Sequence, residues 1–142
     1  MNTGVPPLSR ARDILRDGVV HYKPLHVLLV PVFGRVRALG LRAARLPVSM
    51  PQTPARVFVS QYPEGYQSGM AVHRDTMVAH VAVTLVVTND AEDGCFFVAS
   101  AAGVTRAVPL AEGWAVAVDP DTWHGVEEIL RVSKWISITF FF

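Results

Sequence analysis

Cysteine is almost absent from this chain: Cys95 is the single one among 142 residues, which excludes an intrachain disulfide. A lone cysteine suits a reducing compartment and most simply acts as a small apolar side chain. Long apolar runs are absent too. The longest early run, Val27 to Phe33, contains Pro31 and falls short of the roughly 18 residues that span a bilayer. Residues 1–7 lack a basic start followed by an apolar core, which argues against a secretory signal. We therefore expect a cytoplasmic protein without a membrane partner.

Net charge is close to zero, at +1, but it is unevenly distributed along the chain. Residues 1–47 contain eight Lys or Arg and two Asp, whereas residues 48–142 contain five Lys or Arg and ten Asp or Glu. A basic segment can meet nucleic acid or an acidic substrate. Its arginines alternate with apolar residues, which favours the solvated face of a supporting helix over a nucleic-acid site. These arginines are Arg35, Arg37, Arg42 and Arg45.

The composition favours one β-rich domain over residues 1–142. Apolar residues make up 51% of the chain, and ten Gly and ten Pro supply many turns. We expect residues 1–47 to form N-terminal helical support. The pattern predicts a helix over Ser9–Arg16, a short strand over Val19–Tyr22, and a second helix within Lys23–Arg45 that starts or breaks near Pro31.

Residues 48–142 read as many short strands separated by turn residues. Such spacing predicts a sandwich or barrel. The double-stranded β-helix, or jelly roll, is the version that gathers residues from distant strands around one pocket. The expected fold is therefore mostly β, a jelly-roll catalytic core with supporting N-terminal helices. The expected strands are Arg56–Tyr62, Gly69–Arg74, His80–Thr88, Cys95–Ala99, Val104–Val108, Trp114–Val118 and Arg131–Phe142.

The most informative motif is an H-x-D pair, His73 and Asp75, followed much later by His124. Side chains alternate along a strand, so His73 and Asp75 point the same way while Arg74 turns away. Two imidazoles and one carboxylate leave the opposite positions of a metal open, which is the ligand set of a non-haem Fe(II) oxygenase. A single H-x-D triplet can arise by chance. The metal reading therefore depends on the residues that accompany it.

Lys134 is the first of these accompanying residues. It lies ten residues beyond His124 and is the only charged residue in the strand-like run from Lys134 to Phe142. A Lys on a half-buried strand usually extends its ammonium to solvent. Near a metal ligand it fits an anion anchor better, because a buried ammonium needs a carboxylate to balance its desolvation cost. Arg131 is a second candidate, although an odd separation of three would place the two on opposite strand faces.

These motifs resemble the 2-oxoglutarate and Fe(II)-dependent dioxygenases, specifically the prolyl-4-hydroxylase-like branch, over roughly residues 56–142. The resemblance implies that His73, Asp75 and His124 bind iron and that Lys134 pairs with the distal carboxylate of 2-oxoglutarate. It also implies that Tyr62 hydrogen-bonds this cosubstrate. Most members have Arg where Lys134 stands, but Lys followed by Trp is similar to the collagen prolyl 4-hydroxylases. The segments that carry the resemblance are H-R-D at 73–75, H-G-V-E-E-I at 124–129 and K-W-I-S-I at 134–138.

The activity implied by the resemblance is hydroxylation of a C–H bond, coupled to decarboxylation of 2-oxoglutarate to succinate. The implied cofactors are Fe(II) and 2-oxoglutarate, with ascorbate as a supporting reductant. Because Asp75 is retained, no ligand position is left for chloride, which favours hydroxylation over halogenation. The substrate stays open between a small molecule and an accessible protein or peptide side chain. The short link from Asp75 to Val81 favours the small molecule.

Two further expectations concern alternatives and partners. A catalytically degenerate jelly roll that binds a ligand or partner without turnover is the alternative function. Retention of three ligands and a charged anchor argues against it. The aromatic-rich terminal strand predicts a homodimer formed through that strand or through the N-terminal helices, because an exposed apolar edge invites association. Nucleic acid is not an expected partner.

Overall fold

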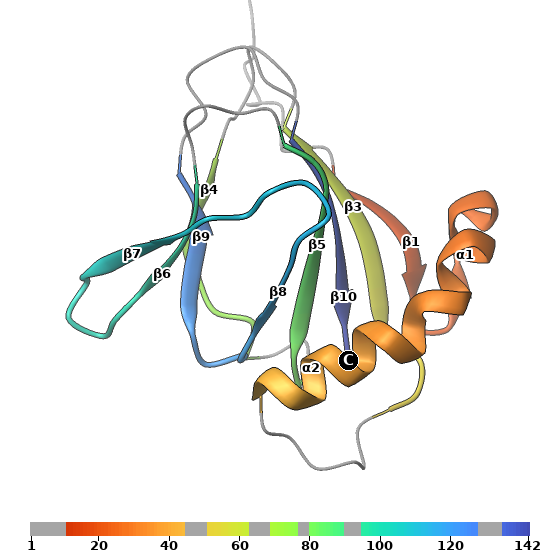
Figure 1. Ribbon diagram of the computed structural model, residues 1–142. Helices are drawn as coiled ribbons and strands as arrows, with labels where there is room; N and C mark the ends of the chain where they lie inside the picture. The colour runs from red at the N-terminus through yellow and green to blue at the C-terminus, as the bar shows by residue number, and fades with distance from the viewer. Residues whose placement is uncertain (1–10, 45–50, 63–68, 77–79, 90–94, 128–134) are drawn as a thin grey trace, which may run out of the picture.

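The computed structural model describes residues 11–44, 51–62, 69–76, 80–89, 95–127 and 135–142. Within them, two antiparallel sheets form a jelly-roll sandwich, as the sequence predicts (Figure 1). The larger sheet has the strand order β2-β1-β3-β10-β5-β8 and the smaller has the order β4-β9-β6-β7. The strands are β1 Arg12–Arg16, β2 Val19–Val20, β3 Arg56–Tyr62, β4 Met70–His73, β5 Ala82–Asn89, β6 Phe96–Ala99, β7 Thr105–Val108, β8 Ala115–Val118, β9 Trp123–Val126 and β10 Trp135–Phe141.

The N-terminal segment begins with a strand and not with the expected helix. The prediction of a helix over Ser9–Arg16 is wrong, because Arg12–Arg16 form β1 and pair with β3. Ile14 and Leu15 are buried by this pairing, and tertiary burial overrides a weak local helix preference. A turn at Asp17 and Gly18, both with positive φ, leads into β2. The large sheet therefore contains strands from both ends of the sequence.

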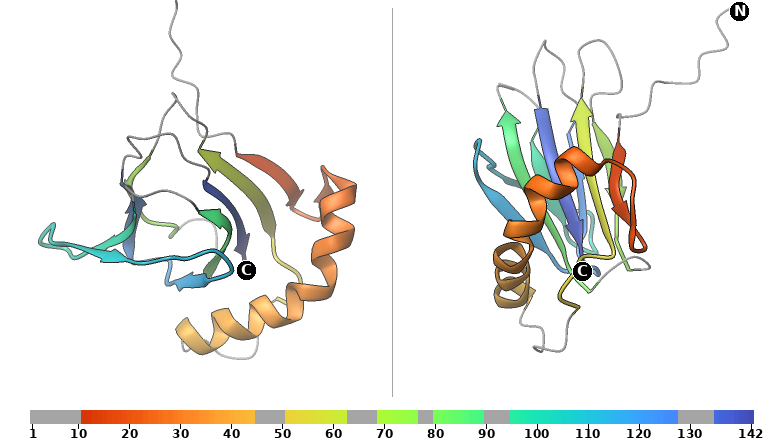
Figure 2. Two further views of the ribbon diagram at one scale, coloured as in Figure 1. Left: turned by 45° about the horizontal axis from the view of Figure 1, so that its top comes forward. Right: turned by 90° about the vertical axis from the view of Figure 1, so that its right-hand side faces the viewer.

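A bent helical segment covers the outer face of the large sheet (Figure 2). It consists of α1 (Lys23–Leu29), a 3-10 turn η1 (Val30–Val32) and α2 (Phe33–Ala44). The predicted break near Pro31 is confirmed, since Pro31 lies in the 3-10 turn. The Phe33 ring packs edge-on against Phe140, with centroids 6.1 Å apart. A Cβ on Gly40 would lie 2.9 Å from Cγ1 of Val81, so glycine allows this close approach to the sheet.

By length and composition, the stretch Lys23–Ala43 is also apolar enough to cross a membrane, with a mean hydropathy of 1.3. In this structure its inner side packs on the sheet through Leu29 and Phe33. A search for uninterrupted apolar runs misses this apolar stretch, because isolated arginines and glycines divide it into short pieces.

The terminal strand β10 is central in the large sheet, paired with β3 on one side and β5 on the other. The aromatic-rich end of the chain is therefore paired and buried within this chain, with Phe140 and Phe142 both buried, and the homodimer stays a prediction. Alternation along β10 divides the core in two. Ile138 and Phe140 face the helices, whereas Trp135 packs in the core between the two sheets. That inner space contains the candidate site.

Candidate metal centre

His73 and His124 lie side by side because β4 pairs antiparallel with β9, with these two residues as direct partners. Their ring centroids are 4.3 Å apart. Sequence reasoning identified both residues but not strand β9, because the four residues Trp123–Val126 form too short a pattern. Gly125 makes the strand possible here. A Cβ at this position would lie 2.7 Å from both the Met70 carbonyl oxygen and Cζ of Phe97.

Asp75 completes the group from just beyond the end of β4. Its backbone N–H donates to the Pro120 carbonyl at 3.1 Å, which ties it to the turn before β9. Its Oδ1 lies 3.6 Å from Nε2 of His73, and its Oδ2 lies 3.3 Å from Nε2 of His124. One ligand atom from each of the three residues lies within 4.8 Å of the others. The predicted triad is thus brought together, with room for one cation.

Backbone carbonyls orient both imidazole rings. Nδ1 of His73 donates to the Ala71 carbonyl at 2.8 Å, and Nδ1 of His124 donates to the Thr122 carbonyl at 2.9 Å. In this tautomer the Nε2 lone pairs face Asp75, which is how a second-shell hydrogen bond prepares a metal-binding histidine. Burial lowers the pKa of His124, but its hydrogen bonds to Asp75 and Thr122 and the Asp75 charge outweigh burial and raise the pKa overall. A divalent cation bound at Nε2 of His124 would compete with protonation of the ring.

Asp119 builds the turn that precedes β9. Asp119 Oδ1 accepts from the Asp121 N–H at 2.8 Å, and its carbonyl accepts from the Thr122 N–H at 3.0 Å. This side chain therefore forms the turn instead of reaching the metal site. Its consequence is indirect, since the turn supplies the Thr122 carbonyl that orients His124.

The three residues of the triad line a cavity of about 70 Å³ between the two sheets. Hydroxyl groups form part of its wall on β3, β5 and β10, and sequence reasoning did not identify them. The hydroxyls of Thr84 and Thr139 share a hydrogen bond of 2.9 Å. Ser60 and Ser137 are paired across β3 and β10 and are 8% and 5% exposed. Within the described residues, neither serine hydroxyl has a hydrogen-bond partner, so both are available to a polar ligand.

Of the two residues predicted to bind the cosubstrate, Lys134 and Tyr62, the structure describes only the backbone of Tyr62. Lys134 and the competing Arg131 lie outside the described residues. The backbone of Tyr62 ends β3 opposite Trp135, two positions beyond Ser60, while its side chain is outside the described part. Among the described residues that line the cavity there is no Lys or Arg.

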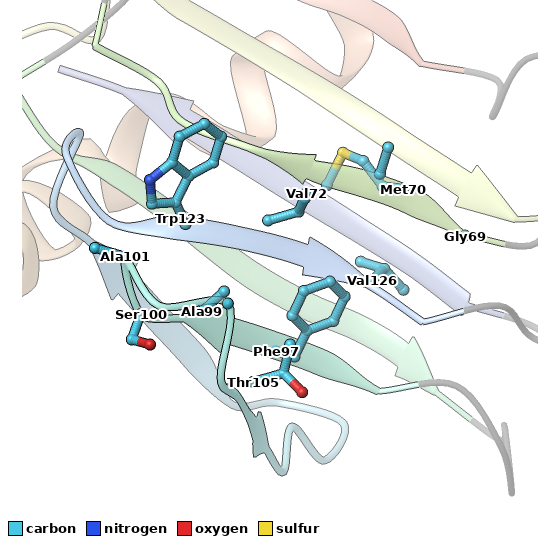
Figure 3. A pocket seen from close by; sticks show the side chains of 12 residues that line it. Gly69, Met70, Val72, Phe97, Ala99, Ser100, Ala101, Thr105, Trp123 and Val126 are labelled. Atoms are coloured by element: carbon cyan, nitrogen blue, oxygen red, sulfur yellow. The ribbon is translucent and has the colours of Figure 1, made fainter.

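The opposite face of the small sheet carries a second hollow, an open apolar groove of about 730 Å³ that shares Met70 and Val126 with the metal cavity (Figure 3). Trp123 lies on this outer side because it alternates with His124 along β9. The Arg74 guanidinium lies 4.6 Å from the centre of the Trp123 ring, so Arg74 does turn away from the metal site as predicted. Trp123 thus shapes the outer groove and not the metal cavity. The groove is lined mainly by Met70, Val72, Phe97, Ala99, Trp123 and Val126.

Comparison with solved structures supports this reading of the fold. An oxidoreductase of the 2OG-Fe(II) oxygenase family from Burkholderia pseudomallei superposes with a TM-score of 0.73 at 17% identity, covering 92% of this chain and 66% of that one. EvdO2 from Micromonospora carbonacea var. aurantiaca, solved with 2-oxoglutarate, gives 0.65 at 17% identity, covering 95% and 67%. The chain has the jelly-roll fold of these oxygenases.

A third neighbour is SnoN, a non-haem alpha-ketoglutarate-dependent epimerase from nogalamycin biosynthesis. It gives a TM-score of 0.62 at 14% identity, covering 80% of this chain and 54% of that one. No protein-family model matches the sequence, and no curated protein matches it closely enough to be a relative. The chain covers 66% of the length of the Burkholderia oxidoreductase and 54% of the length of SnoN.

Proposed function

We propose that this protein is an Fe(II)- and 2-oxoglutarate-dependent oxygenase that hydroxylates a C–H bond. The observation that carries the proposal is the convergence of His73, Asp75 and His124 on one point inside a jelly roll. Two imidazoles and one carboxylate fit Fe(II) and leave coordination positions open. The neighbour solved with 2-oxoglutarate supports the same pair of cofactors. We further propose that the chain is related to the prolyl-4-hydroxylase-like branch, on the basis of its K-W-I-S-I segment.

The chain's own residues prepare the site for that chemistry. When bound, Fe(II) would activate oxygen at the expense of 2-oxoglutarate, which becomes succinate. His73, Asp75 and His124 would hold the metal, and the carbonyls of Ala71 and Thr122 fix the two rings. His124 and Asp75 are buried and limit the access of bulk water to their side of the site, whereas His73 is partly exposed.

The cosubstrate would extend from the metal into the hydroxyl-lined cavity. Lys134 and Tyr62 are proposed to bind its distal carboxylate, on the basis of the family pattern. Ser60 and Ser137 can add hydrogen bonds to the same group, since their buried hydroxyls lack other partners in the described residues. A charged acceptor at this place would satisfy them.

The proposed substrate is a small molecule. The proposed location of the protein is a reducing compartment such as the cytoplasm. Two of the structural neighbours are alpha-ketoglutarate-dependent enzymes of nogalamycin biosynthesis, a non-haem epimerase and a non-haem carbocyclase. These enzymes support small-molecule chemistry on this fold. Hydroxylation rests on the retained Asp75, which occupies the position that a halide would need.

One observation favours a second function, a jelly-roll module that binds an acid ligand without turnover. The described cavity wall offers hydroxyls but no cation to neutralise a dianionic cosubstrate. Neutral donors alone bind a buried carboxylate less strongly than a cation does. This reading predicts metal and ligand binding without reaction.

The deciding experiment measures succinate formed from 2-oxoglutarate by the Fe(II)-loaded protein, alone and with candidate small molecules. The oxygenase proposal predicts succinate above the Asp75→Ala control, and stimulation by the true substrate. Tight 2-oxoglutarate binding in equilibrium dialysis without any succinate would instead establish the binding module.

A further inference from the structure

A long part of the chain contains no acidic residue at all. Between Asp17 and Glu64 every charged side chain is a Lys or Arg. This part includes the whole helical segment α1–η1–α2. The surface of that segment therefore has positive charge that its own sequence cannot neutralise.

The helical segment presents two different sides. Leu29, Phe33 and Gly40 recur at helical spacing and pack on the large sheet. The other side is solvent-exposed and is also largely apolar, with Leu28 and Val27 70% and 59% exposed. On α2, Arg35, Leu39 and Arg42 recur at helical spacing and share the exposed side, while Lys23, Val27 and Leu28 are exposed on α1. We call the exposed set the outward stripe: Lys23, Val27, Leu28, Arg35, Leu39 and Arg42.

The cations of the outward stripe lack ion-pair partners. In the described part of the chain, the salt bridges of Asp13 and Asp17 go to Arg16 and Arg56 on the strands. Lys23, Arg35 and Arg42 have none there. Moreover, only 22% of the most apolar stretch of this helical segment is buried. An exposed apolar surface of this kind marks an interaction site, and the unpaired cations beside it remain available to an anionic partner.

We propose that the outward stripe docks on an anionic lipid bilayer surface. A helix with exposed aliphatic residues flanked by Lys and Arg lies in the membrane interface, with its apolar side chains inserted and its cations at the headgroups. Charge selects this occupant over a second copy of the chain, because two outward stripes face to face would bring only like charges together. The protein would lie on the membrane and not span it, since Leu29 and Phe33 hold the segment on the sheet.

The proposal does not depend on the oxygenase activity and is tested with the full chain and lipid vesicles. Co-sedimentation compares vesicles of phosphatidylcholine alone with vesicles that also contain phosphatidylglycerol. We expect binding to the anionic vesicles only, weakening as salt rises because screening shortens the reach of the charges. Arg35→Gln with Arg42→Gln should weaken binding about twenty-five-fold, at about fivefold for each cation near an anionic surface.

Matched controls separate docking from general stickiness. Leu28→Glu should abolish vesicle binding, whereas Val104→Glu should not, although Val104 on the far β6–β7 hairpin is equally exposed at 68%. Arg106→Gln on β7 is the control for charge. Circular dichroism and thermal melting check that each variant is folded. Failure of the wild type to bind anionic vesicles overturns the proposal, as does equal binding by Leu28→Glu. A dimer in light scattering that Leu28→Glu dissociates, without vesicle binding, would assign the stripe to a second copy instead.

Discussion

Nε2 of His124 lies 3.3 Å from Oδ2 of Asp75, although the two residues are far apart in the sequence and only one of them lies in a strand. The contact depends on the pairing of β4 with β9 and on the Asp75 N–H bond to the Pro120 carbonyl. The Asp75 carboxylate therefore lies between two imidazoles. A metal cation would stabilise this arrangement, and it would compete with protons for the same ligand atoms.

Removing any one ligand should abolish the metal site. His73→Ala, Asp75→Ala and His124→Ala should each weaken Mn(II) or Fe(II) binding by more than about 100-fold, since even second-shell losses cost 10–100-fold. Titration calorimetry with Mn(II) under anaerobic conditions measures this. His80→Ala is the control, because His80 is exposed and lies outside the cavity lining. Full metal occupancy in all three variants would show that the triad is not the site.

The buried serines should contribute to cosubstrate binding. Ser137→Ala should weaken 2-oxoglutarate binding to the Mn(II)-loaded protein by roughly tenfold to a hundredfold, as expected for the loss of one hydrogen bond to a charged group. Equilibrium dialysis measures the dissociation constant. Ser100→Ala serves as the control, because its hydroxyl accepts from the Val104 N–H away from the cavity. Unchanged binding in Ser137→Ala would place the distal carboxylate elsewhere.

Lys134 should contribute more than any serine. Lys134→Ala should cost about 2–5 kcal/mol of 2-oxoglutarate binding free energy, by analogy with truncated buried charge pairs. That range corresponds to about thirty-fold to several-thousand-fold weaker binding. Lys134→Arg should be milder, and Arg131→Ala should have little effect. The reverse order of the two alanine variants would show that the assignment of the anchor is wrong.

Gly125 should tolerate no side chain. Gly125→Ala places a Cβ against the Met70 carbonyl and the Phe97 ring, so we expect a loss of about 1–3 kcal/mol in unfolding free energy. Urea denaturation gives this value. In Gly34→Ala a Cβ would meet nothing within 4 Å, and replacing a helical glycine should leave stability equal or raise it by up to about 1 kcal/mol. Equal stability of the two variants would contradict the close packing of β4, β9 and β6.

Cys95 should be an unreactive thiol at neutral pH. Partial burial, its hydrogen bond to Glu127 at 3.0 Å and the charge of that carboxylate raise the pKa of Cys95 to about 11. Only the thiolate reacts, so labelling by a disulfide reagent should be slow at pH 8 and should accelerate as pH rises towards about 11. Glu127→Gln removes the charge, lowers the pKa and should speed labelling at pH 8. Glu112→Gln, in a distant turn, should not. Rapid labelling of the wild-type protein would refute the Glu127 contact.

The sequence by itself determined which groups can perform chemistry and where most strands lie. Side-chain alternation is a local property, so the shared direction of His73 and Asp75 and the opposite direction of Arg74 were predictable. The bounds of β3 were predicted correctly, as was the break at Pro31, because turn residues and proline act on the backbone next to them.

Only the tertiary structure decided how those pieces meet. Arg12–Arg16 became a strand because β3 offers hydrogen bonds and a core for Ile14, which no local signal encodes. The four-residue strand β9 is defined by its pairing with β4 and β6. Ser60 and Ser137 also depend on the tertiary structure, because their hydroxyls become candidate ligand groups only where the two sheets enclose a cavity. Long-range pairing and burial, unlike alternation, depend on residues that are distant along the chain.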